Sequence, residues 1–328
     1  MHSPFTALCL LISATLTHDL FAHEAPALPE AVQEIYPTVY KNKIWVAGGI
    51  SSTLPAEQGN MTEKVHFWSS EEKQWLQAPS LPEGRHHTYL QAAAGKLFAF
   101  GGFINSKQGQ WLNSADVLLL DETKNTWRKV AELPIPLSET VGTVIKGKIH
   151  LAGGRSPQSK QNGQWQHSTD TAAHFVFDPK DYTFSSASPL PSPRNSAATV
   201  ITDNGWIVIG GRQIGGDNLT DVLIYDVDNN NWRSLPPLPE ARAGHAAALK
   251  GDYIYIFGGE HHSGVYQNIL KYHIKTNTWQ SIKTWPEARH GLGSATLNDQ
   301  IWLMGGALNT GLANTQNELI NAETLLKQ

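Results

Sequence analysis

The sequence predicts an all-β fold, a six-bladed β-propeller, from three observations. An apolar segment ending in a Gly-Gly pair occurs six times along the 328 residues. The copies are spaced by about 50 residues, which is a repeat length of blade-type architectures. The composition, with 40% hydrophobic and 16% charged residues, 28 Gly, 18 Pro and 11 Trp, is typical of many short strands joined by turns. We therefore expect one repeated unit that closes into a ring.

The Gly-Gly segments define the repeat. They cover residues 44–49, 97–102, 149–154, 206–211, 253–259 and 301–306. The first glycines of successive pairs are 53, 52, 57, 48 and 47 residues apart. Each copy must be one supersecondary unit that buries its faces against its neighbours.

Three further features follow each glycine pair in the same order. An Asp or Asn opens an apolar strand, as at Asp116, Asp221 and Asn268. A large aromatic residue comes after the next turn, namely Trp75, Trp127, Phe184, Trp232 or Trp279. A proline-marked corner then leads into a strand of small residues, as at residues 81–83 and 238–240.

These features predict four strands per unit, from strand a at the axis to strand d at the rim. The glycines end strand b where a side chain would obstruct a tight exit. The aromatic residue on strand d forms an apolar wedge between blades, and ring closure leaves only short edges exposed.

The six copies resemble the Kelch repeat in length and element order. The resemblance implies a single six-bladed Kelch-type propeller over residues 23–328. The last copy, residues 317–328, has no Trp, so Leu325 and Leu326 are expected to form its strand d. Residues 27–30 repeat the proline corner, so the N-terminal segment is expected to join the last blade to the first.

The first residues resemble a signal peptide, predicted over residues 1–22. Residues 4–16 are apolar and too short to span a membrane, and Ala22 or Ala25 offers a small residue for cleavage. The sequence therefore predicts a periplasmic or secreted protein that is not inserted in the membrane after cleavage. The single cysteine, Cys9, lies in this segment, so the exported chain is expected to have no disulfide or lipid anchor.

The formal net charge of −4 gives no global field that would attract nucleic acid or an anionic membrane. Any charged site must be local. The histidines do not occur in a metal-ligand spacing, because neighbours such as His86 and His87 point apart on a strand. We expect no metal site and no cofactor.

Two sets of positions are predicted to share one face of the ring, because the d-to-a corners and the b-to-c loops open on the same side. The corners carry Arg85, Arg194, Arg242 and Arg289, with Gln33 and Glu139 near the equivalent places. The positions just after the glycines carry Ile50, Phe103, Arg155, Arg212, Glu260 and Ala307. Six arginines are thus predicted around one opening, which suits a carboxylate or phosphate ligand.

A structural role is the alternative for the corner arginines, which could pair with carbonyls or carboxylates of neighbouring blades. Trp111 and Trp165 end two similar polar loops in the second and third blades, as Gly-Gln-Trp in both. They are predicted either to stack on a ligand at the opening or to pack their own loops onto the blades.

In size, export signal and layout the chain resembles the periplasmic sialic acid epimerases (mutarotases), which are Kelch propellers acting on an acidic sugar. The resemblance implies an acid and a base at the sugar ring together with a cation for its carboxylate. Glu260 and His290 are the residues predicted to be catalytic, with Glu139 as the alternative carboxylate and His86 as the alternative partner. The Glu that marks the family's site after a glycine pair, and the Arg six residues later, are replaced here by Arg212 and Asn218.

Two functions therefore remain open from the sequence. One is binding, and possible mutarotation, of an acidic sugar. The other is a non-catalytic scaffold that binds a protein or an acidic peptide. The copper chemistry of galactose oxidase, which also uses a Kelch propeller, is excluded because it needs a cysteine outside the predicted signal peptide.

Overall fold

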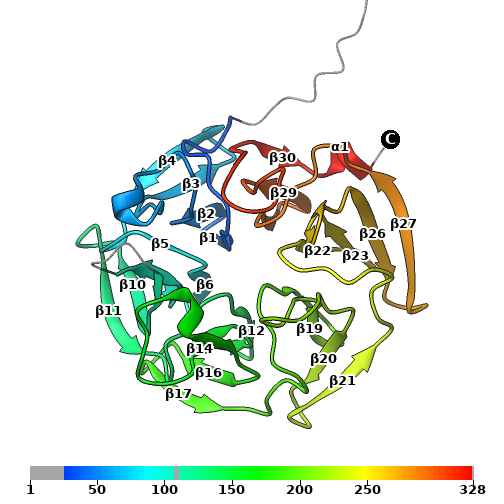
Figure 1. Cartoon of the computed structure of the whole chain (residues 1–328), viewed down its shortest axis with the longest axis horizontal. Helices are drawn as coiled ribbons and strands as arrows, with labels where there is room; N and C mark the ends of the chain where they lie inside the picture. The colour runs from blue at the N-terminus through cyan, green and yellow to red at the C-terminus, as the bar shows by residue number, and fades with distance from the viewer. Residues whose placement is uncertain (1–25, 107–110, 327–328) are drawn as a thin grey trace, which may run out of the picture.

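The computed structural model describes residues 26–106 and 111–326. The predicted signal peptide, residues 1–22, lies outside the described residues. Within them, six large sheets surround a central axis (Figure 1), five with four strands and one with three. The predicted all-β propeller is thus the observed fold.

The strands of each large sheet follow chain order from the axis to the rim, and all neighbours are antiparallel. The first three sheets are β1 (Thr38–Tyr40), β2 (Lys43–Ala47), β3 (Val65–Ser69), β4 (Gln74–Ala78); β6 (Tyr89–Ala93), β7 (Lys96–Phe100), β10 (Asp116–Asp121), β11 (Thr126–Glu132); and β12 (Val141–Ile145), β13 (Lys148–Ala152), β16 (His174–Asp178), β17 (Thr183–Ser186). The last three are β18 (Ala198–Thr202), β19 (Gly205–Ile209), β20 (Val222–Asp226), β21 (Asn231–Leu235); β22 (Ala246–Lys250), β23 (Tyr253–Phe257), β26 (Asn268–His273), β27 (Thr278–Thr284); and β28 (Gly293–Leu297), β29 (Gln300–Met304), β30 (Leu319–Asn321).

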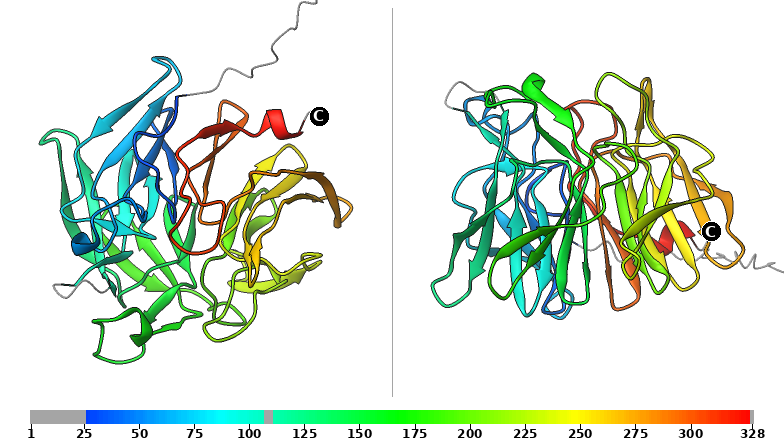
Figure 2. Two further views of the ribbon diagram at one scale, coloured as in Figure 1. Left: turned by 45° about the horizontal axis from the view of Figure 1, so that its top comes forward. Right: turned by 90° about the horizontal axis from the view of Figure 1, so that it is seen from below.

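Short elements extend the loops that follow the glycine pairs. They are β8 (Phe103–Asn105), β9 (Trp111–Asn113), β14 (Arg155–Pro157), β15 (Ser168–Asp170), β24 (Glu260–His261), β25 (Gly264–Val265) and the 3-10 helices η1 (Ala56–Gln58) and η2 (Trp165–His167). A further short strand, β5 (Arg85–His86), lies at a corner and pairs with β8. In side view η2 projects from one face of the ring (Figure 2), which we call the loop face.

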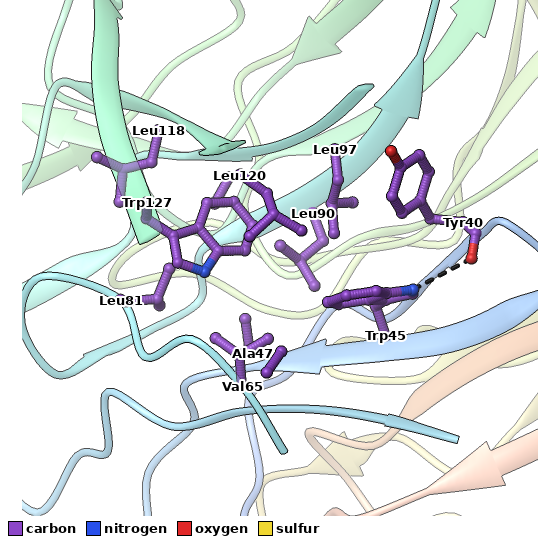
Figure 3. Packing of buried hydrophobic residues seen from close by; sticks show 12 residues of the cluster. Tyr40, Trp45, Ala47, Val65, Leu81, Leu90, Leu97, Leu118, Leu120 and Trp127 are labelled. Atoms are coloured by element: carbon purple, nitrogen blue, oxygen red, sulfur yellow. Dashed lines mark hydrogen bonds between the residues drawn. The ribbon is translucent and has the colours of Figure 1, made fainter. Parts of the chain in front are cut away.

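The predicted aromatic wedges join neighbouring blades. Trp127 on β11 packs with Leu118 and Leu120 of its own blade against Trp45 and Val65 of the first blade (Figure 3). Its indole N–H donates to the carbonyl of Pro79 at 2.9 Å. Burial of such a side chain contributes about 1.5–3 kcal/mol to folding.

The same indole contact recurs around the ring. Trp232 and Trp279 donate to the carbonyls of Ser188 and Pro236. Phe184 holds this position on β17 and has no such donor. The repeat period therefore reflects one interlocking contact between successive blades.

A second contact explains the glycine pairs. The N–H of the second glycine donates to the carbonyl of the next blade's corner residue, for example Gly259 to Arg289 at 2.9 Å. Gly258 and Gly259 have φ of 61° and 94°, a conformation that L side chains rarely adopt. A Cβ on Gly258 would also overlap the Arg289 carbonyl. Glycine is therefore required on both counts.

The same bond closes the ring. Gly306, in the last blade, donates to the carbonyl of Val32 in the N-terminal segment at 2.9 Å. Leu28 N–H donates to the carbonyl of Asn317, and the Trp75 indole donates to that of Pro26. The N-terminal segment joins the last blade to the first, as predicted.

The last blade differs from the sequence expectation. Leu325 and Leu326 belong to a short helix, α1 (Glu323–Leu326), and do not form a strand d. Both pack against the apolar cluster between the fifth and sixth blades. The helix thus covers apolar surface without adding a fourth strand to the described residues of this sheet. No helix in the described part of the chain is long and apolar enough to cross a membrane.

Candidate functional site

The corner and post-glycine positions lie side by side on the loop face, as expected from the topology. The residue after each corner forms a bridge with the residue after a glycine pair, as Asn195 does with Arg212 and Ala243 with Glu260. The corner positions themselves are Val32, Arg85, Leu137, Arg194, Arg242 and Arg289, because these residues accept the second-glycine N–H. Gln33 and Glu139 therefore lie one and two residues beyond the corner position to which the sequence comparison assigned them.

The four corner arginines hold blades together and do not line the opening. Arg85, Arg194, Arg242 and Arg289 are at most 2% exposed. Each Nη1 donates to the carbonyl of the first glycine 16 residues later, at 2.9–3.2 Å. Each Nη2 faces a carboxylate of its own blade, as Arg194 faces Asp221 at 3.0 Å. This geometry is the structural alternative considered above for these residues.

A ring of strained residues surrounds the axis two positions beyond each corner. All six have φ between 49° and 61°, and they are Glu34, His87, Glu139, Ser196, Gly244 and Gly291. Main-chain hydrogen bonds link successive members, as Glu34 N–H to Gly291 and Gly291 N–H to Gly244. Strain of this kind costs about 1–3 kcal/mol per non-glycine residue and is common at functional sites.

The charged members of this ring form a buried network. Nε2 of His87 lies 2.7 Å from Oε2 of Glu34. Burial alone would raise the pKa of Glu34, but His87, His290 and Arg212 outweigh it and hold that pKa well below its usual value. Burial lowers the pKa of His87, yet Glu34 and Glu139 raise it above the usual value. These opposite shifts favour the charged forms of both groups.

Glu139 connects the network to two arginines from post-glycine positions. Its Oε1 lies 3.2 Å from Nε of Arg155, and its Oε2 lies 3.8 Å from Nη2 of Arg212 and accepts a 2.5 Å bond from Ser196. Burial would raise the pKa of Glu139, but Arg155, His87 and Arg212 outweigh it and lower that pKa. The two arginines thus favour the ionised form of Glu139 in a site where it is 2% exposed.

Arg155 and Trp165 form one unit. The guanidinium of Arg155 lies 4.0 Å from the centre of the Trp165 ring and is 2% exposed. Trp165 is 38% exposed, so the indole covers the arginine and turns its other face to solvent. Trp111, by contrast, packs between the second blade and the first: its ring is 4.4 Å from that of His86, and its N–H donates to the carbonyl of Gly59 in a loop of the first blade. The other residues of its predicted loop, 107–110, lie outside the described residues.

Arg212 and Glu260 lie at the inner end of a pocket of about 510 Å3 on the loop face. Arg212 Nη1 donates to Glu260 Oε1, and its Nε donates to Asn195 Oδ1 at 3.1 Å. Burial lowers the pKa of Arg212, but Glu139, Glu260 and Glu34 raise it well above the usual value. With its side chain 28% exposed, Arg212 is a fixed cation that faces the pocket.

His290 lies behind Glu260, away from the pocket. Its Nδ1 is 3.7 Å from Oε2 of Glu260 and 3.7 Å from Oε1 of Glu34. Its Nε2 lies 2.7 Å from the carbonyl oxygen of Asn309 and donates to it. The predicted pair of Glu260 and His290 is thus brought together, but only Glu260 reaches the pocket.

Other pocket residues offer hydroxyl, amide and aromatic groups. They are Gly216, Asp217, Asn218, Ala241, His261, His262, Tyr266 and Thr310. The ring of Tyr266 lies 4.7 Å from that of His261 and 4.3 Å from the guanidinium of Arg242. The pocket therefore combines one arginine, two carboxylates and an aromatic wall, which is a composition suited to a small polar ligand.

Sequence reasoning missed Glu34 and the role of His87. The signal was available: residues two beyond each corner form their own column, and three of its six members are ionisable. Among the described residues, no group of three or more His, Cys, Asp or Glu side chains is arranged to hold a metal ion.

Comparisons with known proteins agree with this architecture. Residues 35–238 match the family model described as the KLHDC2/KLHL20/DRC7 Kelch-repeats domain, and residues 241–284 match the Kelch motif. The chain is similar to Kelch-like protein 35 of Mus musculus, 26% identical over 240 residues, covering 73% of this chain and 37% of that protein.

Two further similarities are to a curated epimerase and to the fold of a solved structure. N-acetylneuraminate epimerase of Haemophilus influenzae is 25% identical over 275 residues, covering 78% of this chain and 60% of that protein. The solved structure of YjhT superposes with a TM-score of 0.76 at 17% identity, covering 90% of this chain and 95% of that one. The chain spans less than two thirds of the length of these two sequence relatives. With the first family model matching more than half of its length, the chain belongs to the Kelch-repeat family.

Proposed function

We propose that this chain is an exported protein that binds an acidic sugar of the sialic acid class in the pocket of Arg212 and Glu260 and catalyses its mutarotation. The observation that carries the proposal is the position of Glu260, which faces the pocket and lies between Arg212 and His290. The similarity to N-acetylneuraminate epimerase of Haemophilus influenzae supports the choice of sugar.

Arg212 supplies the cation for the sugar's carboxylate. Its Nη2 is 3.8 Å from Glu139, beyond hydrogen-bond length, so this nitrogen has capacity for a ligand oxygen. The fixed, partly desolvated guanidinium is suited to a planar carboxylate. In the mutarotase family the Glu after a glycine pair and the Arg six residues later belong to one blade, and this chain has Arg212 and Asn218 at those positions. Here Glu260 and Arg212 instead form a Glu–Arg pair between two neighbouring blades.

Mutarotation needs a base at the anomeric hydroxyl and an acid at the ring oxygen. Glu260 fits the base, because its carboxylate is held by Arg212 and reaches the pocket. His261 and Tyr266 line the same pocket and offer donors for the ring oxygen. Glu260 takes the proton of the anomeric hydroxyl as the bond between the anomeric carbon and the ring oxygen breaks, and the donor protonates the ring oxygen. After rotation about the adjacent C–C bond, that oxygen attacks the other face of the carbonyl and returns its proton to the donor, while Glu260 returns its proton to the new anomeric hydroxyl.

The proposal is tested by NMR of freshly dissolved α-N-acetylneuraminic acid with and without the protein. We expect micromolar protein to accelerate anomer exchange and Glu260→Gln to abolish the acceleration. Glu71→Gln, an exposed carboxylate on the rim, is the matched control and should retain full activity. An exchange rate that is the same with and without wild-type protein rejects the catalytic proposal for this sugar.

Export is proposed from the N-terminal sequence alone. Cell fractionation followed by mass spectrometry of the N-terminus should find the chain outside the cytoplasm and beginning at His23 or Pro26. An intact N-terminus on a cytoplasmic protein would reject export.

A second candidate, capture of an acidic peptide, is favoured by Trp165, which stands exposed on the loop face above Arg155. In that case a peptide rich in Asp and Glu should bind with micromolar affinity, and Trp165→Ala should weaken it. Saturable binding of the monosaccharide with no binding of the peptide would reject this candidate.

A further inference from the structure

Two loops of similar sequence place their tryptophans differently on the loop face. Residues 109–111 of the second blade and 163–165 of the third both read Gly-Gln-Trp. Trp111 is satisfied within the fold, because its ring packs on His86 and its N–H donates to the carbonyl of Gly59. Trp165 is 38% exposed and is one of four large apolar side chains that reach solvent in the described part of the chain. Packing of its own loop therefore does not account for the position of Trp165.

The indole of Trp165 is held firmly in this exposed place. Arg155 supports its inner face, with the guanidinium 4.0 Å from the ring centre, and Glu139 lies 3.2 Å from Nε of Arg155. The loop that carries Trp165 is tied to the second blade: Asn113 N–H donates to Asn162 Oδ1 at 2.9 Å, and Asn162 Nδ2 donates to the Asn113 carbonyl at 2.7 Å. Its helix η2 projects from the loop face (Figure 2). A rigid aromatic face is thus turned to solvent, with little conformational freedom left to lose on binding.

A second exposed side chain continues this face towards the pocket. Ile214 is 39% exposed, and its N–H donates to Oδ2 of Asp170, whose backbone pairs with that of Arg155 in the β14–β15 hairpin. Ile214 also lies two residues beyond Arg212, which faces the pocket. Trp165 and Ile214 thus flank the Arg155–Asp170 pair from neighbouring blades, and we call these two side chains the platform.

The platform offers apolar contact and a hydrogen-bond donor in place of a free charge. The indole covers the guanidinium of Arg155. The carboxylate of Asp170 already accepts the N–H of Ile214 and an N–H of Asn195. The indole N–H of Trp165 donates to no acceptor among the described residues and stands at the edge of an open apolar face. A pyranose ring, with an apolar C–H face bordered by hydroxyl groups, matches both features.

We infer that the platform binds a second sugar ring, attached to the acidic sugar whose carboxylate binds Arg212. The inference rests on the proposed function, because it assumes that the acidic sugar occupies the pocket. The Glu139 carboxylate and the Arg155 guanidinium lie between Nη2 of Arg212 and the indole. A ring on the indole is therefore a different ring from the one held by Arg212. The substrate is then an acidic oligosaccharide whose reducing end lies in the pocket, because mutarotation needs an unsubstituted anomeric hydroxyl.

Calorimetric titration of N-acetylneuraminic acid and of its α2,8-linked dimer into the wild-type protein tests the platform. We expect the dimer to bind about tenfold more tightly than the monosaccharide, as for one well-placed aromatic contact. The ratio of the two affinities should be the same at about 0.1 M and about 1 M NaCl, because salt does not screen stacking on an indole. A gain that came from the dimer's second carboxylate would shrink at the higher salt concentration.

Variants separate the platform from the pocket. Trp165→Ala should abolish the gain of the dimer while lowering the affinity for the monosaccharide only about threefold. Trp165→Phe keeps a ring and should retain most of the gain. Trp111→Phe, in the equivalent loop of the second blade, is the matched control and should keep the wild-type ratio. Should Trp165→Ala fail to fold, Ile214→Ser tests the other half of the platform and should reduce the gain without changing the affinity for the monosaccharide.

The outcomes distinguish the two proposals. Equal affinities of the wild-type protein for the monosaccharide and the dimer would overturn the platform and leave the proposed function standing. A gain that survives Trp165→Ala, or that shrinks at high salt, would assign it to charge and also overturn the platform. Binding of an Asp- and Glu-rich peptide that Trp165→Ala abolishes, with no gain for the dimer, would give this surface to a protein partner. No binding of either sugar would instead reject the proposed function.

Discussion

Two sets of arginines lie within a few residues of each other on the loop face and do different things. The corner arginines, such as Arg194 and Arg242, are buried and bound to backbone carbonyls of glycine pairs. The post-glycine arginines, Arg155 and Arg212, are bound to carboxylates around the axis, and Arg212 faces a pocket. Residue type alone does not separate the two sets.

Their recurrence along the repeat separates the two sets of arginines. A corner arginine satisfies a contact that every blade must make, so it recurs in four copies, and Val32 and Leu137 keep the carbonyl part of that contact in the other two. The post-glycine position makes no side-chain contact that recurs in every blade, and its six copies hold five different residue types. Within a repeat protein, a charged residue that departs from the repeat is therefore the better candidate for function.

The largest expected effect is on stability at a corner. Arg242→Met keeps the length of the side chain but removes its donors to the carbonyls of Gly258 and Asn268. We expect the free energy of unfolding to fall by about 3 kcal/mol, because buried acceptors lose their partners. Urea unfolding measures this, with the exposed Arg233→Met as control. A loss equal to that of the control would remove the distinction between the two sets.

Arg212→Gln should show the opposite balance. Loss of the guanidinium that faces the pocket should weaken binding of N-acetylneuraminic acid by about thirtyfold or more, as for a desolvated charge pair. Its effect on unfolding should be smaller than that of Arg242→Met. Ligand titrations and urea unfolding curves of both variants measure the two effects. An Arg212→Gln protein that unfolds readily but binds the sugar normally would show that Arg212 has the structural role.

Mild acid should weaken the contact between the third and fourth blades, because two buried histidines lie there. His150 and His174 lie between the third and fourth blades, with Nδ1 of His150 2.9 Å from Nε2 of His174, and burial lowers the pKa of each to about 4. Their usual value is 6.5, so the unfolded chain binds more protons between these values. This part of the stability is complete above pH 6.5 and is lost as the pH falls towards 4.

We expect the pair to cost roughly 2 kcal/mol of stability between pH 7 and pH 5. The double variant His150→Phe/His174→Leu should flatten this part of the pH profile of urea unfolding. A profile as steep as that of the wild type would show that other groups cause the acid sensitivity.

The smallest expected effect is at Trp165. Trp165→Ala removes the ring above Arg155 and should lower the affinity for the acidic sugar only about threefold, as for an exposed cation–π contact. Calorimetric titration of the sugar into the variant measures this loss of affinity. A loss as large as that of Arg212→Gln would place the main ligand contact at Arg155.

The fold could be predicted from the sequence because its contacts repeat. The Gly-Gly pairs make one hydrogen bond to the next corner in successive blades, and the N-terminal corner accepts the last of these bonds. The strand-d tryptophans make a second recurring bond through the indole N–H, so the period reveals both contacts. The fate of Leu325 and Leu326 could not be predicted in this way, because nothing repeats there and a short helix buries the same side chains.

The site was predictable only in part. Arg212, Glu260 and His290 came from positions that the repeat marks. Their contacts did not, because Arg212 meets Glu260 across a blade boundary and Glu34 reaches His290 from the opposite end of the chain. Such pairings depend on ring closure, which local sequence patterns do not encode.

Arg212, which lies outside the repeated contact, is proposed to bind the ligand, and the corner arginines hold the ring together. Calorimetric titration of N-acetylneuraminic acid into wild-type protein and Arg212→Gln, both shown to be folded by their unfolding curves, tests it most directly. We expect saturable binding by the wild type and a loss of affinity of about thirtyfold or more in the variant. Equal affinities for the two folded proteins would contradict it.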